Sequence, residues 1–264
     1  MVRVMIEGIQ KAADMLWGAS CSGSPCAPVR EHLDDLDISS AYQVQEINTE
    51  RRLAEGRRLV GRKTGLTAKA VQRQLGVDQP DYGMLFDDMD VPLGEEISVA
   101  RVMQPKVEAE IAFVLGDDLD CETLTSADIV ASVAYAVASI EVVGSRVANW
   151  DINIHDTIAD NASSGVFVLG DQPRRLGEID LRLCGMVMER RGEPISVGAG
   201  VACLGSPVAA ALWLAKVMAR AERPLRKGDI VLTGALGPMV EVEAGDAVTA
   251  RINGLGSVTA QFTA

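Results

Sequence analysis

Alternating apolar and polar positions mark the clearest β-strand of the sequence, at residues 107–115. Its apolar residues fall on one face of an extended chain: Val107, Ala109, Ile111, Phe113 and Leu115. Shorter apolar runs between turn signals predict further strands at residues 139–143, 166–169, 181–188 and 229–233. The end of the chain predicts a hairpin, with strands at residues 247–252 and 257–262 on either side of Asn253 and Gly254.

Helix signals dominate the first third of the chain. Ser40 and Gln43 form a capping-box pattern, which opens a helix running towards Gly56. Thr67 is the expected cap of a shorter helix through Leu75, where Gly76 stops it. A Ser-, Gly- and Pro-rich stretch at residues 21–28 predicts a mobile loop before the first of these helices.

Two helices are expected later in the chain. Residues 125–138 place apolar side chains at helical spacing, with Thr125 and Asp128 at the start. Ser206 followed by Pro207 is a strong helix start, and that helix runs through Ala221. The pattern as a whole predicts an α+β protein with a helical part at residues 1–80 packed on a strand-rich core at residues 81–264. The two parts are expected to form one integrated unit.

Composition and charge exclude several classes of protein. The chain has 264 residues with 48% hydrophobic and 23% charged side chains, which is typical of a globular protein. A net charge of −12 argues against nucleic acid as the main partner. The sequence shows neither a membrane-spanning apolar run nor a secretory signal at its start. Its five scattered cysteines form no C-x-x-C pair and indicate a reducing cytoplasm.

Two carboxylates on the strand at residues 107–115 are candidate metal ligands. Glu108 and Glu110 project together from the face opposite the apolar residues. Glu141 is a plausible third ligand, because a glutamate in an apolar strand is rarely buried unpaired. A hard divalent ion such as Mg²⁺ suits three carboxylates. The alternative is a solvated face on which Lys106 simply pairs with the two glutamates.

Three further segments carry chemistry. Lys63 lies between two glycines at residues 61–66, either in a surface turn or as a cation near an anionic substrate. Asp81 lies in a rigid turn at residues 78–83, as a cap or as a general base. Small polar groups at residues 161–165 precede a strand, as in many turns. The sequence contains no G-x-S-x-G elbow, P-loop or G-x-G-x-x-G helix start, so nucleotide binding is not supported.

Five segments together resemble the 2-keto-4-pentenoate hydratase family of the fumarylacetoacetate hydrolase superfamily. They are residues 61–67 (GRKTGLT), 74–83 (QLGVDQPDYG), 105–111 (PKVEAEI), 160–164 (DNASS) and 253–258 (NGLGSV). The resemblance runs over residues 41–262. It implies a fumarylacetoacetase-like core, which is a folded mixed β-sheet, with a helical N-terminal part. It also implies that Mg²⁺ or Mn²⁺ is bound by Glu108, Glu110 and Glu141.

The resemblance further implies a reaction and its residues. Water adds to 2-hydroxypenta-2,4-dienoate to give 4-hydroxy-2-oxopentanoate, a step in the meta-cleavage breakdown of aromatic compounds. Lys63 and Asp81 match polar groups of the family's active site. From the chemistry of the reaction we expect the lysine to offset negative charge and the aspartate to move protons or activate water. The matching substrate-binding positions are Leu66, Asn161, Ser163, Ser164 and Thr233.

Three alternatives stay open beside the hydratase. Close relatives decarboxylate 2-oxo-3-hexenedioate (4-oxalocrotonate) with the same three glutamates. Acylpyruvate hydrolases rank lower, because they use a His–Glu pair and no glutamate closely follows His32. The third alternative is a non-catalytic metal-binding partner subunit. The resemblance also implies a homo-oligomer in the cytoplasm and association with a neighbouring enzyme of the pathway.

Overall fold

The fold is described from a computed structural model, which describes residues 2–33, 37–69, 72–73 and 77–264. The helices are α1 (Val2–Ser22), α2 (Ser39–Ala54), α4 (Ser126–Ser132), α5 (Ile154–Ala159) and α6 (Pro207–Arg220). The strands are β1 (Leu59–Gly65), β2 (Asp81–Phe86), β3 (Glu96–Ser98), β4 (Lys106–Leu115), β5 (Val133–Val143), β6 (Val166–Leu169), β7 (Gly185–Arg190), β8 (Glu193–Ala199), β9 (Ile230–Ala235), β10 (Val240–Glu241), β11 (Ala247–Ile252) and β12 (Gly256–Thr263).

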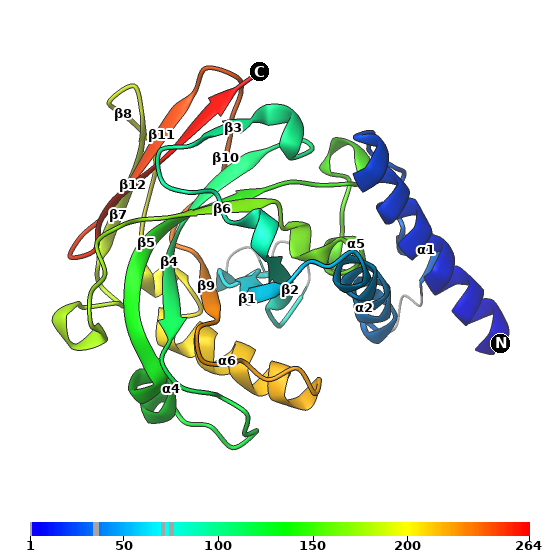
Figure 1. Ribbon diagram of the computed structural model, residues 1–264, viewed down its shortest axis with the longest axis horizontal. Coiled ribbons are helices and arrows are strands. Elements are labelled where there is room, and N and C mark those ends of the chain that lie inside the picture. Colours follow the sequence, from blue (N-terminus) through cyan, green and yellow to red (C-terminus); the bar gives the residue numbers. More distant parts are fainter. Residues whose placement is uncertain (1, 34–36, 70–71, 74–76) are drawn as a thin grey trace.

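The strands form two sheets within the described residues. The larger has the order β2-β1-β9-β4-β5-β6, with β10 added beside β4, and it is mixed because β1 runs parallel to β9. The smaller has the order β3-β12-β11-β7-β8. Figure 1 shows the smaller sheet at the upper left, α6 below the larger sheet, and α1 and α2 on the far right. This is the α+β architecture with mixed sheets that the sequence predicted.

The main core lies between the two sheets and under α6. Long strands β4 and β5 pair along almost their whole length, from Lys106 opposite Val143 to Leu115 opposite Val133. Their apolar side chains, such as Phe113 and Ile140, are fully buried. The alternation predicted for residues 107–115 is therefore confirmed. The other face of these strands carries the glutamates and, further along, Ala112 and Val137, which are buried in a smaller apolar cluster.

A second, smaller hydrophobic cluster joins the N-terminal helices to α5. It contains Ile9, Leu16 and Val44, which come from α1 and α2. The predicted mobile loop at residues 21–28 is anchored here instead. Its Cys26 donates a backbone hydrogen bond to Arg146, and the Cys26 carbonyl accepts one from Ala148.

Several predicted elements begin or end elsewhere. The helix predicted at residues 125–138 ends at Ser132, because the apolar run from Val133 pairs with β4 as strand β5. The local helical pattern is overridden there by strand pairing. The first predicted cap is also wrong: α2 begins at Ser39, whose backbone N–H donates to the Asp37 side chain, while Ser40 donates its hydroxyl to the Asp37 carbonyl.

Other predicted elements agree closely with the structure. Ser206 caps α6, with Pro207 in its first turn, and the terminal hairpin folds at Asn253 and Gly254. The predicted strand at 166–169 is β6. The helix expected to begin at Thr67 is only partly described, since Leu75 and Gly76 lie outside the described residues.

Two predicted turns are strands of the larger sheet. Residues 61–65 belong to β1, which lies between β2 and β9, and Asp81 begins β2. Residues 1–80 therefore contribute a central strand as well as helices. The proposed division at residue 80 stays a prediction.

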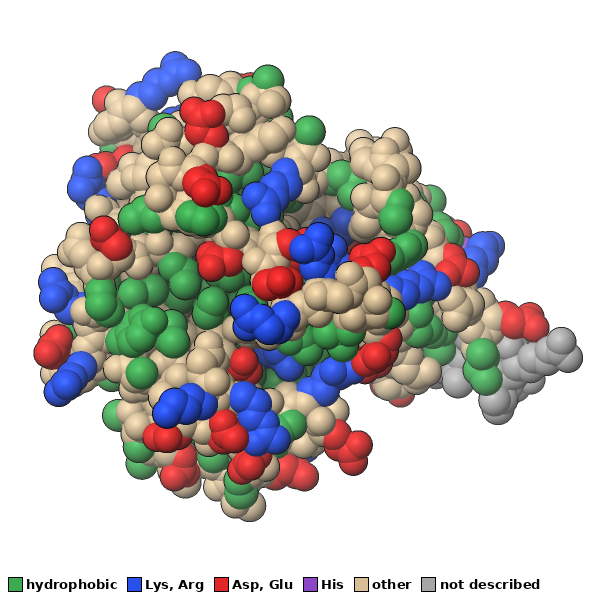
Figure 2. All heavy atoms as spheres, in the orientation of Figure 1, with side chains coloured by type: hydrophobic (Ala, Val, Ile, Leu, Met, Phe, Trp, Pro, Cys, Tyr) green, Lys and Arg blue, Asp and Glu red, His purple; other side chains and the backbone are tan. Residues whose placement is uncertain are grey.

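One described stretch, Gly200–Arg220, is long and apolar enough to cross a membrane by length and composition, with a mean hydropathy of 1.7. It contains α6, whose residues Ala210, Leu214 and Met218 are buried in the main core. Its helical part, α6, therefore packs into the core of this fold. Figure 2 shows acidic and basic side chains interspersed over the face of the molecule seen there, with hydrophobic ones gathered on the left.

Candidate metal and catalytic site

Three glutamates converge on the polar face of β4 and β5. Glu108 and Glu110 lie two positions apart on β4 and point the same way, and Glu141 lies directly opposite Glu108 in the pairing with β5. One carboxylate oxygen of each lies within 4.8 Å of the others. The structure thus brings together the three predicted metal ligands, while their binding of an ion stays a prediction.

The donor atoms of this triad fit a hard divalent cation. Both oxygens of Glu141 are buried and have no hydrogen-bond partner, although the Lys63 ammonium lies 3.4 Å from Oε1. A single lysine leaves the three clustered carboxylates short of positive charge, which is costly in a buried site. Burial raises the pKa of Glu141 to about 7. Burial and the neighbouring carboxylates also raise the pKa of Glu110 well above its ordinary value. An ion held by the three carboxylates would offset this repulsion, and oxygen ligands suit Mg²⁺ and Mn²⁺ alike.

Lys106 does not neutralise the glutamates. Its ammonium lies 3.5 Å from the Glu241 carboxylate and 4.8 Å from the centre of the Trp150 ring. The alternative interpretation, in which Lys106 simply pairs with Glu108 and Glu110, is therefore wrong.

Lys63 supplies the positive charge beside the triad. Its side chain extends from β1, is almost fully buried, and lies with Nζ 3.4 Å from Glu141 Oε1. The ammonium also donates a hydrogen bond of 2.8 Å to the Ala162 carbonyl. Burial alone would lower the lysine pKa, but Glu141, Asp81 and the other glutamates raise it above its ordinary value. Lys63 is therefore held as a cation.

Asp81 lies next to this lysine at the start of β2. Its strand position pairs with Gly65 at the end of β1, and its side chain is 1% exposed. Burial raises the pKa of Asp81, whereas the Lys63 ammonium and a hydrogen bond from Thr157 act to lower it. Its Oδ1 atom has no hydrogen-bond partner. A buried carboxylate with a free oxygen beside a cation is suited to accepting or delivering a proton.

Glu110 is held in place by main-chain groups of β9. The Gly234 N–H donates to Glu110 Oε2 at 2.9 Å. Thr233, a predicted substrate-binding residue, is fully buried and donates its hydroxyl to the Ile111 carbonyl. The Thr233 carbonyl accepts a hydrogen bond from the Cys203 thiol, with 2.6 Å between sulfur and oxygen. In the structure the Thr233 side chain therefore fixes β9 against β4, and its role towards a substrate stays a prediction.

The predicted substrate-binding segment, residues 161–164, is a tight turn with left-handed backbone. The φ angles of Asn161, Ala162 and Ser163 are 54°, 51° and 56°. Asn161 binds the backbone of Met84 with both ends of its amide, and Ser164 donates to the Asn161 carbonyl. The Asn161 side chain therefore holds the turn to β2, and the Ser164 hydroxyl closes the turn, whose Ala162 carbonyl accepts a hydrogen bond from Lys63.

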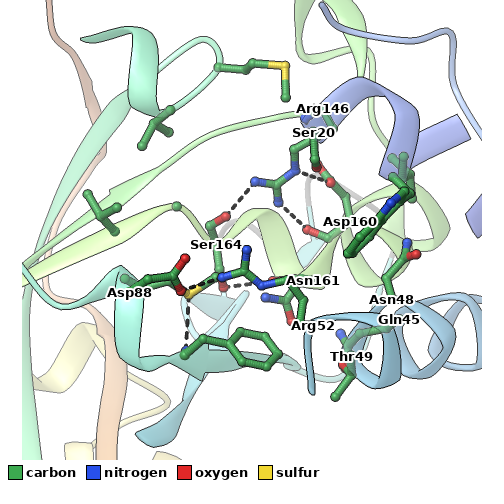
Figure 3. A pocket seen from close by; sticks show the side chains of 18 of the residues that line it. Ser20, Gln45, Asn48, Thr49, Arg52, Asp88, Arg146, Asp160, Asn161 and Ser164 are labelled. Atoms are coloured by element: carbon green, nitrogen blue, oxygen red, sulfur yellow. Dashed lines mark hydrogen bonds and ion pairs between the residues drawn. The ribbon is translucent and has the colours of Figure 1, made fainter. Parts of the chain in front are cut away.

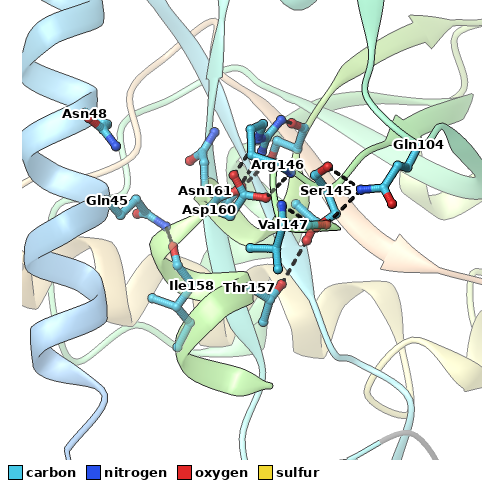
Figure 4. Close-up of polar contacts among 12 residues, drawn as sticks. Gln45, Asn48, Gln104, Ser145, Arg146, Val147, Thr157, Ile158, Asp160 and Asn161 are labelled. Atoms are coloured by element: carbon cyan, nitrogen blue, oxygen red, sulfur yellow. Dashed lines mark hydrogen bonds and ion pairs between the residues drawn. The ribbon is translucent and has the colours of Figure 1, made fainter. Parts of the chain in front are cut away.

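Arg146 clamps the same turn from outside (Figure 4). Its guanidinium contacts the Asp160 carboxylate and carbonyl and donates to the Ser164 carbonyl at 2.7 Å. The Arg146 backbone N–H also donates to Asp160. Four contacts to two residues make this ion pair a structural support of the turn.

A cavity of about 330 Å³ lies beside this turn, and the three glutamates are not among its lining residues. Among its lining residues are Trp17, Arg52, Arg146, Asp160, Asn161 and Ser164. Figure 3 shows the side chains of Arg52, Arg146, Asp160, Asn161 and Ser164 around the space between the N-terminal helices and the turn. Asn161 and Ser164 therefore line this cavity as well as forming the turn that holds Lys63 through the Ala162 carbonyl.

Leu66 follows directly after β1, and its carbonyl accepts a hydrogen bond from the Gln72 side chain at 2.7 Å. Its φ angle of 54° is in the left-handed region. Ser163 is the remaining predicted residue, and its hydroxyl lies 3.1 Å from that of Thr157. The roles of Leu66 and Ser163 towards a substrate stay predictions.

Sequence reasoning missed three groups of this site. The Ala162 carbonyl and the Gly234 N–H are main-chain groups, and every residue carries such groups, so no side-chain pattern reveals them. Thr157 lies in an ordinary short helix, and only the folding of α5 against β2 brings it to Asp81.

Known proteins are similar to this chain over most of its length. Residues 55–263 match the family described as "Fumarylacetoacetate (FAA) hydrolase C-terminal". "TodF product hydratase" of Pseudomonas putida strain F1 is 63% identical over 254 residues, covering 96% of this chain and 95% of that protein. "2-keto-4-pentenoate hydratase 1" of Dechloromonas aromatica strain RCB is 58% identical over 262 residues, covering 99% of this chain and 100% of that protein.

A solved structure agrees with the fold over nearly the whole chain. It is 4-oxalocrotonate decarboxylase from Pseudomonas putida G7, complexed with magnesium and adipate, which has a TM-score of 0.92 and 35% identity, with 97% of each chain covered. The family match, the relatives and this structure agree with the fold described above. The chain belongs to the fumarylacetoacetate hydrolase family.

Proposed function

We propose that this protein is a metal-dependent hydratase that converts 2-hydroxypenta-2,4-dienoate into 4-hydroxy-2-oxopentanoate in the meta-cleavage breakdown of aromatic compounds. The observation that carries the proposal is the convergence of Glu108, Glu110 and Glu141 beside the buried Lys63 and Asp81. Relatives named 2-keto-4-pentenoate hydratase, 53–58% identical to this chain, support the reaction class.

Glu108, Glu110 and Glu141 would hold the ion, which is Mg²⁺ or Mn²⁺. When bound, such an ion supplies Lewis-acid polarisation of the oxygens of a 2-oxo acid. The lysine ammonium, 3.4 Å from Glu141, adds a fixed positive charge at the same place. Because the site is buried, these charges act with little screening by water on the negative charge that develops during the reaction.

The reaction needs proton transfers at two stages, and Asp81 is the group that we assign to them. In the first stage the proton of the 2-hydroxyl group leaves and a proton is added at C5, which gives the conjugated 2-oxo-3-enoate. In the second stage the oxygen of a water molecule bonds to C4, and a proton is added at C3. The sum is the addition of one water molecule. Asp81 takes or delivers these protons; burial raises the pKa of this carboxyl group, and the Lys63 ammonium next to it acts in the opposite direction.

Decarboxylation of 4-oxalocrotonate is the second candidate, and the solved decarboxylase supports it at 35% identity. Its substrate carries a second carboxylate, which needs a positive partner. Within the described part of the chain, Lys63 is the cation whose charge lowers the pKa of all three glutamates. Lys63 is already bound to Glu141 and the Ala162 carbonyl. This observation and the higher identity of the hydratases favour hydration.

The test is an assay of the purified protein with Mg²⁺ and 2-hydroxypenta-2,4-dienoate. We expect the absorbance of the dienol to disappear and the product mass to increase by that of one water molecule. Loss of carbon dioxide from 4-oxalocrotonate, without hydration, would favour the decarboxylase. Cleavage of an acylpyruvate would favour a hydrolase. Metal binding without turnover of any of these substrates would favour a non-catalytic partner subunit.

The assembly and location of the protein are part of the same proposal. We expect a homo-oligomer in the cytoplasm that associates with an enzyme acting before or after it. The five free cysteines are consistent with a reducing compartment. Light scattering of the purified protein tests the oligomeric state.

A further inference from the structure

The face of β4 that carries the metal ligands becomes more exposed towards the start of the strand. Because a strand repeats every two residues, Lys106, Glu108, Glu110 and Ala112 lie on this one face. Ala112 is fully buried, in an apolar cluster that also contains Val137 of β5. Glu110 is 1% exposed, Glu108 is partly exposed, and the Lys106 side chain is 19% exposed. The face is therefore covered at Ala112 and meets solvent at Lys106.

Two neighbours hold the Lys106 ammonium at this exposed end. The ammonium lies 4.8 Å from the centre of the Trp150 ring, whose face attracts a cation. The indole N–H of Trp150 donates a 3.0 Å hydrogen bond to the Gln104 carbonyl, two residues before Lys106, which fixes the ring to the same segment. Glu241 pairs with Lys106 across β10 and β4 and places a carboxylate oxygen 3.5 Å from the ammonium.

The two neighbours hold the lysine with different firmness. The side chain of Glu241 is 83% exposed, so water competes for both charges and the ion pair contributes little. The Trp150 ring, by contrast, is tied to the main chain. Lys106 can therefore stay over the ring when its ion pair with Glu241 opens. The exposed end of the site carries one positive charge held by a ring and one negative charge held loosely.

An anionic substrate has to approach this site against the charge of the protein. The chain has a net charge of −12, and Glu108, Glu110 and Glu141 lie together at the site. A cation at the mouth of a cleft raises the local concentration of an anion. Two residues of a strand span only about 7 Å, which is less than the Debye length of about 10 Å at 0.1 M salt. The charge of Lys106 therefore acts on an anion that arrives at Glu108.

We propose that Lys106 and Glu241 form the charged rim of the site, at which Lys106, held by Trp150, attracts the anionic substrate and Glu241 opposes it. The inference rests on the proposed function and deepens it, because it assigns recruitment of the substrate to residues outside the metal ligands and the proton-transfer group. Neither rim residue exchanges a proton with the substrate. Their opposite charges predict opposite effects on substrate capture.

The first experiment removes each rim charge and measures steady-state kinetics at saturating Mg²⁺ and low salt. Lys106→Met is expected to lower kcat/KM about 3- to 10-fold, as for one unit charge acting over roughly 10 Å near a protein surface. Glu241→Gln is expected to raise kcat/KM about 2- to 5-fold by the same physics. Both variants should keep kcat within about 2-fold of the wild type, because rim charges act mainly on association.

Two control variants accompany these measurements. Lys106→Arg keeps the positive charge and should keep the kcat/KM of the wild type. Lys11→Met, on the exposed side of α1, changes the net charge by the same amount as Lys106→Met and should leave kcat/KM unchanged. If Lys106→Met folds poorly, Glu241→Gln decides the question alone, because the Glu241 side chain is mostly exposed.

Ionic strength separates a charge effect from a packing effect. The Debye length falls to about 3 Å at 1 M salt. The differences in kcat/KM between the wild type and the two rim variants should therefore nearly vanish when KCl is raised to about 1 M. A deficit of Lys106→Met that persists at high salt would show that Lys106 acts through packing and would overturn the proposal.

The second experiment measures binding without turnover, by calorimetry with Mg²⁺ and 2-oxopentanoate at low salt. We expect Lys106→Met to bind this anion more weakly than the wild type, and Glu241→Gln to bind it more tightly. A wild type that does not hydrate the dienoate, but whose variants show these opposite shifts, contradicts the proposed function alone. An active wild type whose two rim variants shift kcat/KM in the same direction, or not at all, overturns the rim proposal. A wild type that neither hydrates the dienoate nor binds 2-oxopentanoate contradicts both proposals.

Discussion

Glu108 on β4 and Glu141 on β5 lie directly opposite each other in an antiparallel pair, on the same face of the sheet. Such positions have Cβ atoms only about 4.5–5.5 Å apart, and like charges there are destabilising. Glu110 adds a third carboxylate, and Lys63 provides one positive charge nearby. The sheet therefore holds an arrangement that favours binding of a divalent cation, and its consequences can be measured.

Removing one carboxylate of the triad should weaken metal binding. We expect Glu141→Gln to lower Mg²⁺ affinity by more than roughly 100-fold, since even residues that merely support metal ligands affect affinity by 10- to 100-fold. Titration calorimetry measures the affinity. Glu122→Gln is the control, because Glu122 is 61% exposed and pairs with Arg220. Unchanged affinity in Glu141→Gln would remove Glu141 from the metal site.

The stability of the metal-free protein should fall as pH rises from about 4.5 to about 7. Burial raises the pKa of Glu141 from 4.5 to about 7 in the folded state. The folded state thus binds this proton more tightly than the unfolded state does. The protonated Glu141 therefore contributes to the free energy of unfolding at low pH, and this contribution is lost as pH rises. Thermal melts in EDTA should show a decrease over this range that is smaller in Glu141→Gln.

Metal binding should reverse this pH dependence. Carboxylate ligands must be deprotonated to bind an ion, so Mg²⁺ affinity increases with pH. The rise in Tm on adding Mg²⁺ should therefore be larger at pH 8 than at pH 5. An equal rise at both pH values would contradict the assignment of buried, protonatable carboxylates to the metal site.

Loss of the Lys63 charge should impair catalysis more than folding in the presence of metal. Lys63→Met keeps an apolar chain of similar length but removes the ammonium next to Glu141 and Asp81. We expect kcat to fall by about 10²- to 10⁴-fold, as for loss of an electrostatic or acid–base group. Steady-state kinetics at saturating Mg²⁺ measure this, with circular dichroism as the check on folding.

The matched control for that variant is Lys11→Met, because Lys11 lies exposed on α1, far from the site in sequence and outside the charged cluster. It should retain wild-type kcat. Turnover by Lys63→Met equal to that of the wild type would exclude Lys63 from the mechanism.

A methyl group at Gly65 should disturb the site directly. A Cβ built at Gly65 would lie 2.2 Å from Asp81 Oδ1 and 3.5 Å from Lys63 Nζ, so the carboxylate must move. A misplacement of about 1 Å can cost about 100-fold in rate, and we expect Gly65→Ala to lose activity on that scale. Gly177→Ala is the control, since its Cβ would meet no atom within 4 Å. Full activity in Gly65→Ala would show that the position of Asp81 does not matter.

Local sequence patterns predicted those elements whose final structure matches their own local preference. The strand at 107–115 and the terminal hairpin follow from alternation and turn residues, and α6 follows from its cap and proline. The failures arose where distant partners decided the outcome. Residues 133–138 have a helical pattern, yet they pair with β4, and residues 61–65 have turn-like glycines, yet they form a central strand. A single segment contains no information about the strand that will pair with it.

The sequence by itself determined which charged groups this protein has and that Glu108 and Glu110 share one face, because a strand repeats every two residues. Only the tertiary structure decided that Glu141 lies opposite Glu108, and that Lys63 and Asp81 come from neighbouring strands beside them. Those distances depend on the register of strands far apart in the chain. Register is set by burial of the apolar face of each strand, which is a property of the whole fold.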